Sequence, residues 1–248
     1  MRIKRPTRAI VFCAVLCLLC SCGSIGTIKG MTGSQAFQAQ NLPVRNLRVA
    51  VFTDGSKPDK EIKRTIAQAS LSLRKQVGIA LVPVSWQKIQ FKSSGKAAMI
   101  NQLYRRTLKT LPGNSFDIAV AFTSYNTMDD LKFVFSMLVM PVPVWAGVID
   151  DTYRRYIVMK SMDKDNLIHE VCHGFLFEYV HSSRGVMQGT KLVLLPFTPP
   201  INETQYLTAQ DRNNILKHKF RDFSRRPRLN LPDGDLLNTG QSAASSVQ

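Results

Sequence analysis

The alternation of apolar and polar residues predicts two strand–helix pairs in the first half of the chain. Segment 47–54 alternates and is rich in β-branched residues, as a half-buried strand is. Apolar residues recur at helical spacing in segment 57–78, which ends in glycine, and again in segment 96–112. Segment 79–89 is typical of a second strand, and Pro83 within it predicts a place at a sheet edge or a bulge.

The pattern in the second half predicts three more strands and two more helices. The strands are 116–124, 144–150 and 154–161. A helix begins near Asp163 or Asp165 and runs through a histidine-rich stretch, and segment 205–223 forms a last helix with Thr208 as its cap. We therefore expect an α/β (α+β) domain: a mixed, twisted sheet of about five strands, two packing helices, a histidine-bearing helix and a C-terminal helix.

The first 21 residues are predicted to be an export signal. Four positive charges and no acid precede an apolar run at 9–20, which is shorter than the about 20 residues that span a bilayer. The stretch from Leu19 to Cys22 resembles the bacterial lipobox, which implies cleavage before Cys22 and acylation of its thiol; an ordinary cleaved signal peptide is the alternative. The predicted divisions are a signal at 1–21, a flexible tether at 22–43, a globular domain at 44–225 and a disordered tail at 226–248.

Composition and charge narrow the possible partners. The chain has 248 residues, 44% of them hydrophobic, which is enough to bury the core of one domain. Four of its five cysteines lie at or before Cys22, so Cys172 is the one thiol expected in the mature domain and an intramolecular disulfide is excluded. The formal net charge is +16, but the basic residues are scattered without a DNA-binding motif. This favours a solvated basic surface near an anionic membrane or envelope polymer over nucleic-acid binding.

Three of the four histidines and two of the four glutamates lie within thirteen residues, between His169 and His181. His169 and His173 are four residues apart on the predicted helix, so both side chains lie on one face and can bind one metal ion. Glu170 lies beside this face, where it can accept a proton from a water that zinc activates. The stretch HEVCH thus matches the H-E-x-x-H pattern of zinc-dependent peptidases.

A third zinc ligand has to come from outside this pattern. His181 lies twelve residues after His169, about 18 Å further along a continuous helix, so the helix must end and the chain must turn back. Glu203 is an alternative ligand, although its segment has the composition of a loop. Glu178 would face away from the histidines on the predicted helix, and Cys172 is better explained as a small buried residue on its back.

These features resemble the metzincin clan of zinc peptidases, and within it the matrixin-like branch. HEVCH followed by HSS is similar to that clan's active-site helix and third histidine, which implies His181 as the third ligand and one zinc ion per chain. GVM resembles the clan's Met-turn, which implies that role for Met187. The clan also has an edge strand that binds peptide antiparallel, which implies Trp145, Ala146 and Gly147 as substrate-binding residues.

The chain departs from the clan's pattern at two positions. The clan's spacing places the third histidine where this chain has Tyr179, and a helix-ending glycine where it has Leu176. Without that glycine, the left-handed turn has to be made by a less tolerant residue or two residues later. The third ligand is therefore the least constrained part of the predicted site.

Two classes of function follow from these observations. The first is a membrane-anchored zinc metalloendopeptidase, a hydrolase that cleaves peptide or protein substrates with Glu170 as general base. The second is a non-catalytic binding lipoprotein that keeps the same fold. The intact Glu170 favours the enzyme. We expect a monomer without a nucleic-acid partner, lipid-anchored in the bacterial cell envelope and sorted to the outer membrane, since Gly23 rather than aspartate follows Cys22.

Overall fold

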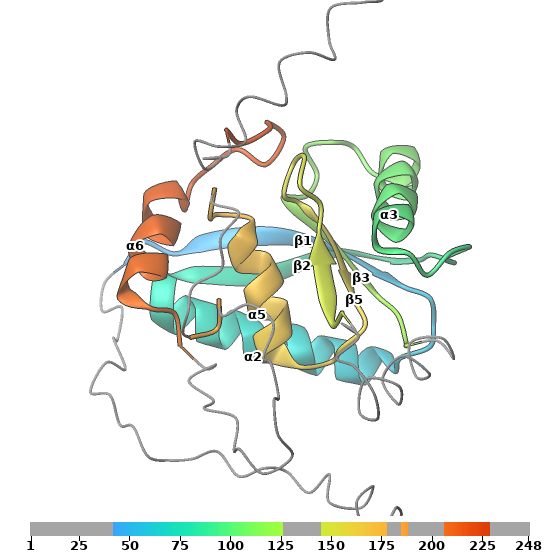
Figure 1. Ribbon diagram of the computed structural model, residues 1–248, viewed down its shortest axis with the longest axis horizontal. Coiled ribbons are helices and arrows are strands. Elements are labelled where there is room, and N and C mark those ends of the chain that lie inside the picture. Colours follow the sequence, from blue (N-terminus) through green and yellow to red (C-terminus); the bar gives the residue numbers. More distant parts are fainter. Residues whose placement is uncertain (1–41, 126–144, 178–184, 188–205, 229–248) are drawn as a thin grey trace, which may run out of the picture. The chain divides into compact units, whose positions relative to one another are not determined.

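The computed structural model describes residues 42–125, 145–177, 185–187 and 206–228, to which the structural statements below refer (Figure 1). In chain order the elements are β1 (Arg45–Thr53), α2 (Asp59–Val77), β2 (Ile79–Lys88), α3 (Lys96–Thr110), β3 (Ile118–Phe122), β4 (Gly147–Ile149), β5 (Tyr156–Met159), α5 (Lys164–His173) and α6 (Ala209–His218). The predicted α/β class with a mixed five-stranded sheet is confirmed. The predicted signal, most of the tether and most of the tail lie outside the described residues, so those boundaries stay predictions.

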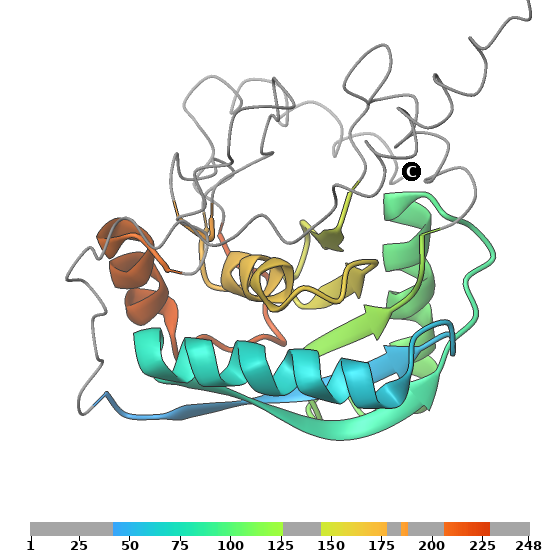
Figure 2. The same ribbon diagram turned by 90° about the horizontal axis from the view of Figure 1, so that it is seen from below.

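The strands form one sheet in the order β2-β1-β3-β5-β4, in which β4 is the antiparallel member and lies at one edge (Figure 1). Alternate residues of β1 face opposite sides of this sheet. Val49 and Val51 pack in one core with α2, α5 and α6, whereas Ala50 and Phe52 pack in a second core with α3. Figure 2 shows α2 and α5 on one side of the sheet and α3 on the other. Because both faces are covered, β3 is a continuous apolar run.

The other edge strand is β2, as its proline predicts. Its pairing with β1 skips Val84, because Pro83 lies opposite Val49 and Ser85 lies opposite Ala50. This is a β-bulge beside the proline, at the edge where a missing N–H costs the sheet least. Both parts of the prediction from Pro83 are therefore confirmed.

Helix ends agree with the sequence where a local signal exists. Gly78 ends α2 in the left-handed conformation (φ 67°), and its N–H donates to the backbone oxygen of Arg74 at 3.0 Å. Thr208 caps α6, since its Oγ1 accepts from the N–H of Asp211 at 3.1 Å. Among the helices of the described residues, none has both the length and the apolar character that crossing a bilayer requires.

The C-terminal helix is shorter than the predicted 205–223 at both ends: it begins at Ala209, after the cap at Thr208, and it ends at His218. Beyond α6 the chain turns, and the guanidinium of Arg221 donates to the backbone oxygen of Tyr153 at 2.7 Å. Phe223 then packs edge-on against Phe175, with ring centroids 5.3 Å apart. These contacts tie the segment after α6 to the β4–β5 hairpin and to the end of α5.

Gly78→Ala is expected to destabilise the domain by at least about 1–2 kcal/mol, because alanine is strained at this positive φ. The added Cβ would also lie 2.5 Å from Nζ of Lys219 and 3.2 Å from the backbone oxygen of Pro43. Urea unfolding midpoints measure the effect. Gly113→Ala is the matched control, since a Cβ at Gly113 meets open space and should change stability by less than about 0.5 kcal/mol. Equal midpoints for the two variants would contradict this account.

Candidate metal centre

The helix α5 carries the predicted histidine pair, and its start is set by a local cap. The carboxylate of Asp163 accepts from the N–H of Asp165 at 2.9 Å, which confirms the predicted start of the helix. Leu167, Ile168 and Val171 are buried in the core that α5 shares with the sheet. With this apolar face against the sheet, the intervening positions are left to form a site.

His169 and His173 lie side by side on α5. Their Nε2 atoms are 3.1 Å apart, and their rings meet at 80° with centroids 4.7 Å apart. Two nitrogens bound to one tetrahedral zinc ion at about 2.0–2.1 Å lie about 3.3–3.4 Å apart. The observed separation therefore fits two nitrogens that bind one ion.

The tautomer of His169 also suits metal binding. Its Nδ1 lies 2.8 Å from the backbone oxygen of Val186, which can only accept a hydrogen bond. Nδ1 therefore carries the proton in the neutral ring, and the lone pair is on Nε2, the atom that faces His173. A backbone partner of this kind is the common way in which proteins orient a metal-binding histidine. On these grounds the donor set fits a zinc ion.

The turn at 185–187 supplies this partner and contains Met187. Its position is fixed by the N–H of Val186, which donates to the backbone oxygen of Tyr206 at 2.9 Å. Gly185 has a φ of 75°, and a Cβ there would lie 2.6 Å from the same oxygen, so glycine is required. Met187 is 1% exposed and belongs to the core that contains the apolar face of α5. The predicted Met-turn residue is thus buried beside the residue that orients His169.

Glu170 is buried next to the edge strand β4. Burial raises the pKa of its carboxyl group to about 8, an effect that the charge of Lys96 opposes. A Cβ on Gly147 would lie 2.8 Å from Cγ and 3.0 Å from Oε1 of Glu170, so the close approach depends on the missing side chain. The predicted edge-strand residue Gly147 therefore borders the predicted general base.

The prediction that 144–150 is one strand needs correction, because β4 begins only at Gly147. Trp145 and Ala146 precede the strand and are held by the two residues that follow β5. The backbone oxygen of Ala146 accepts from the N–H groups of Lys160 (2.8 Å) and Ser161 (3.0 Å). The ammonium of Lys160 lies 4.1 Å from the ring centroid of Trp145, a cation–π contact that fixes the ring.

The helix α5 ends before the position at which the glycine was expected. Its last residue is His173, and Gly174 follows in a right-handed conformation (φ −61°, ψ −23°), so the helix ends without a left-handed residue. A Cβ on Gly174 would lie 2.9 Å from the backbone oxygen of Val171 and 3.2 Å from the ring of Phe223. Close packing against the C-terminal segment explains the glycine. The absence of glycine at Leu176 does not prevent the helix from ending.

Two arginines that the sequence did not single out hold the end of α5. Arg154, 3% exposed, donates to the backbone oxygens of His173 (3.3 Å) and Leu176. Arg221 donates to the backbone oxygen of Gly174. The last carbonyls of a helix lack intrahelical partners and carry partial negative charge, so cations at this end stabilise it. Arg154 and Arg221 therefore position the end of the helix that carries His173.

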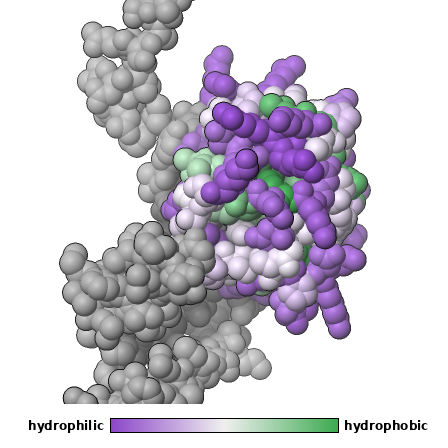
Figure 3. All heavy atoms as spheres, turned by 90° about the vertical axis from the view of Figure 1, so that its right-hand side faces the viewer, coloured by the Kyte–Doolittle hydropathy of each residue, from purple (hydrophilic) through white to green (hydrophobic). Residues whose placement is uncertain are grey.

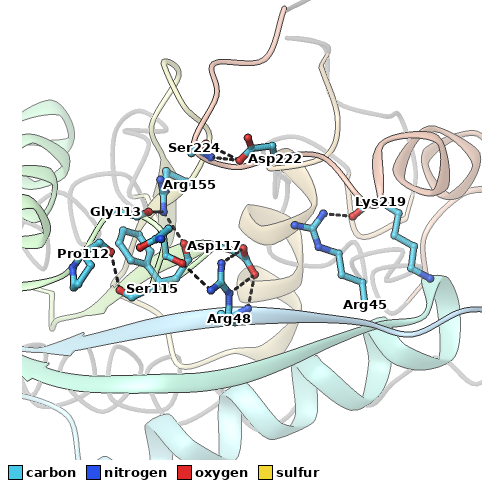
Figure 4. Close-up of polar contacts among 12 residues, drawn as sticks. Arg45, Arg48, Pro112, Gly113, Ser115, Asp117, Arg155, Lys219, Asp222 and Ser224 are labelled. Atoms are coloured by element: carbon cyan, nitrogen blue, oxygen red, sulfur yellow. Dashed lines mark hydrogen bonds and ion pairs between the residues drawn. The ribbon is translucent and has the colours of Figure 1, made fainter.

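The prediction of a solvated basic surface does not hold for several basic residues. Arg155 is 5% exposed and Lys219 is 2% exposed. Arg155 donates to the backbone oxygens of Phe116 (2.8 Å) and Gly113 (3.4 Å), and burial lowers its pKa (Figure 4). Figure 4 also shows Arg45 donating to the backbone oxygen of Lys219. The backbone oxygens that accept from these side chains are far away in the sequence. Because every residue has a carbonyl group, the sequence does not show which basic residues will find such a partner and become buried.

The remaining predicted site residues divide into two groups. Cys172 is fully buried on α5 and burial raises the pKa of its thiol, in agreement with a small core residue. His181, the alternatives Glu178 and Glu203, and the lipidation residue Cys22 lie outside the described residues. Within the described ranges, no group of three His, Cys, Asp or Glu side chains could hold a metal ion. Among the described residues, the geometry therefore brings together two of the three predicted ligands, His169 and His173.

Comparison with known proteins gives similarities of fold only. No model of a known protein family and no curated protein matches the chain. Solved structures that resemble it include archaemetzincin from Methanopyrus kandleri, with 12% identity and a TM-score of 0.48 over 71% of this chain and 97% of that chain. They also include metalloproteinase-II from Bacteroides fragilis, with 12% identity and a TM-score of 0.45 over 73% of this chain and 57% of that chain. A chain of a chaperone–substrate complex also matches, with 10% identity and a TM-score of 0.40, and the protein covers only 25% of the length of that chain.

Proposed function

We propose that this protein is a zinc-dependent metallopeptidase, in which His169, His173 and His181 bind one zinc ion and Glu170 is the general base. The observation that carries the proposal is the 3.1 Å separation of the two Nε2 atoms, with the lone pair of His169 directed by Val186. A zinc ion bound there supplies Lewis acidity, which polarises a carbonyl group and lowers the pKa of water.

Glu170 is suited to move the proton. Burial raises the proton affinity of its carboxylate, so it is a stronger base than an exposed glutamate. A bound cation nearby would act in the opposite direction and keep the carboxylate ionised before the reaction. Glu170 then accepts a proton from the attacking water and passes it to the leaving nitrogen, as peptide hydrolysis requires.

The edge strand β4 is the element that would hold the substrate. One side of β4 pairs with β5, and no strand of the described residues pairs with its other side. The free N–H and C=O groups of an edge strand can pair with an extended peptide. Because Gly147 of β4 touches Glu170, a peptide along this edge passes the general base.

The proposed location is the bacterial cell envelope, where acylated Cys22 would anchor the protein to the outer membrane as a monomer. Several acyl chains on one cysteine anchor a protein firmly, since each buried CH₂ contributes about 0.8 kcal/mol. Without the four positive charges of the predicted signal the formal net charge falls from +16 to +12, which supports a place beside an anionic surface. Peptides or proteins of the envelope would then be the substrates.

Glu170→Gln is expected to lower kcat for peptide cleavage by about 10²–10⁴-fold while zinc stays bound, because the amide cannot accept the proton. Cleavage of a peptide library by the zinc-loaded protein, followed by mass spectrometry, measures the loss. Glu61→Gln, on α2 and far from the histidines in sequence, is the matched control and should keep full activity. Equal turnover by Glu170→Gln and wild type would contradict the role of Glu170. A wild-type protein that binds zinc and cleaves no peptide would favour the non-catalytic binding function.

His173→Ala is expected to weaken zinc binding by more than about 100-fold, because it removes a metal ligand. Loss of a residue that only hydrogen-bonds a ligand already costs about 10–100-fold in affinity. Zinc content after dialysis against a chelator buffer, measured by mass spectrometry, checks this. His218→Gln is the matched control, because His218 on α6 packs against the ring of Phe177 and makes no contact with the pair among the described interactions. The control should retain one zinc per chain. Full zinc content in His173→Ala would exclude the proposed metal site.

A further inference from the structure

A second feature of β4 lies on the face of the sheet away from the histidines. A hollow of about 530 Å³ opens where α3 meets the β4–β5 hairpin. It is lined from α3 by Ala97, Ile100 and Tyr104 and from the hairpin by Val148, Tyr153 and Tyr156, and we call it the tyrosine hollow. Its volume lies within the about 300–1,000 Å³ that is usual for small-ligand sites. Figure 3 shows the molecule from the α3 side, where apolar surface is surrounded by hydrophilic side chains.

The rings of the tyrosine hollow are arranged for contact with another ring. Tyr104 stacks on Tyr153 with centroids 6.3 Å apart and meets Tyr156 edge-on at 5.2 Å. Burial raises the pKa of Tyr156 to about 12, so its hydroxyl group is neutral at physiological pH. Offset and edge-on contacts between aromatic rings stabilise beyond the area that they bury. A further aromatic ring can therefore extend this cluster.

The charges around the tyrosine hollow disfavour a basic side chain. Lys96 and Arg226 both line it, and the guanidinium of Arg226 lies 5.1 Å from the ring centroid of Tyr153. Lys96 stands in the first turn of α3, where no acidic residue offsets the positive end of the helix.

The acidic side of this lining is largely occupied. The carboxylate of Asp150 accepts the N–H groups of Tyr153 (2.6 Å), Arg155 (2.7 Å) and Tyr156 (2.8 Å). Asp150 is also only 8% exposed, so its charge is committed to the hairpin. Asp151 is the other acid of the lining and is exposed. Neutral or anionic aromatic groups are therefore favoured over lysine or arginine side chains.

The alternation of β4 connects this hollow to the proposed substrate edge. Gly147 touches Glu170 on one face, whereas Val148 packs in the core that contains α3 and lines the hollow. A peptide paired with β4 presents successive side chains to these two faces in turn. If one substrate side chain lies on the face of Glu170, its neighbour lies on the face of the tyrosine hollow.

We infer that the tyrosine hollow binds an aromatic side chain of the peptide that lies along β4, and so determines substrate specificity next to the scissile bond. This inference rests on the proposed peptidase function for its substrate. It adds a preference for Phe, Tyr or Trp over Ala, and for these over Lys or Arg, on the face of the sheet opposite to the zinc ligands. Its support is the ring geometry, the charge of the lining and the continuity with β4.

Ala97→Trp tests the inference by filling the hollow from an exposed position of α3. The full chain, loaded with zinc, is given peptides that are identical except for Phe, Ala or Lys at each position flanking the scissile bond. The wild type is expected to cleave the best Phe peptide with a kcat/KM about tenfold or more above its Ala partner, mainly through KM. Ala97→Trp should reduce this ratio to near one. Ala67→Trp, at an exposed alanine of α2, is the matched control and should keep it.

A ratio that stays above about tenfold in Ala97→Trp, or that is near one in the wild type, would overturn the inference. Equilibrium binding separates this outcome from failure of the proposed function. Fluorescence anisotropy of the same labelled peptides is measured with Glu170→Gln and with Glu170→Gln/Ala97→Trp. If the wild type cleaves nothing, the peptidase proposal fails. Even then, the inference that the hollow binds an aromatic side chain is supported if the double variant binds the Phe peptide more weakly than Glu170→Gln does, while binding of the Ala and Lys peptides is unchanged. Equal binding of Phe and Ala peptides by Glu170→Gln counts against it.

Discussion

The hydrogen bond between His169 Nδ1 and the backbone oxygen of Val186 joins α5 to a turn 17 residues later, and the candidate site depends on it. It decides which ring nitrogen carries the proton and which carries the lone pair. The oxygen is held in place because the N–H of the same residue donates to Tyr206. The backbone hydrogen bond between Val186 and Tyr206 thus helps to determine the tautomer of His169 on α5. Without the oxygen of Val186 in place, the ring of His169 would lose the backbone partner that sets its tautomer.

Close approach of backbone and side chain shapes the surroundings of this pair. Gly147 admits the carboxyl group of Glu170 against the edge strand, and Gly174 admits the ring of Phe223 against the end of α5. Both contacts bring α5 against elements that a Cβ atom would hold away. The burial that results raises the pKa of Glu170. The contact at Gly147 therefore helps to bury the candidate general base, and the contact at Gly174 lets the C-terminal segment pack against the end of its helix.

Two arginines from other segments of the chain hold the end of α5. Arg154 comes from the β4–β5 hairpin and Arg221 from the segment after α6, and both donate to backbone oxygens at the end of α5. Arg221 also donates to the hairpin at Tyr153, which lines the tyrosine hollow. The hairpin thus contacts the end of the helix that carries the candidate site through Arg154, and it lines the hollow on the opposite face through its tyrosines. In the proposed function, this position lets one edge strand serve chemistry on one face and selectivity on the other.

Much of the architecture followed from local patterns, because burial of an amphipathic helix or strand imposes its period on the sequence. The helical spacing of 57–78, the alternation of 47–54, the cap at Thr208 and the proline at 83 all had the predicted consequences. The spacing of His169 and His173 likewise predicted their shared face, since that relation is fixed by 3.6 residues per turn.

Tertiary structure decided what depends on contacts between distant segments. The partner of His169, the carbonyl groups bound by Arg154 and Arg155, and the early ends of α5 and α6 have no local signature, because backbone groups are the same in every residue. The strand order likewise required the packed sheet, as did the meeting of α3 with the β4–β5 hairpin that forms the tyrosine hollow. The sequence by itself determined the elements and the histidine spacing, since both arise within a few residues; the site's proton positions and the second face of β4 arise only where separate elements meet.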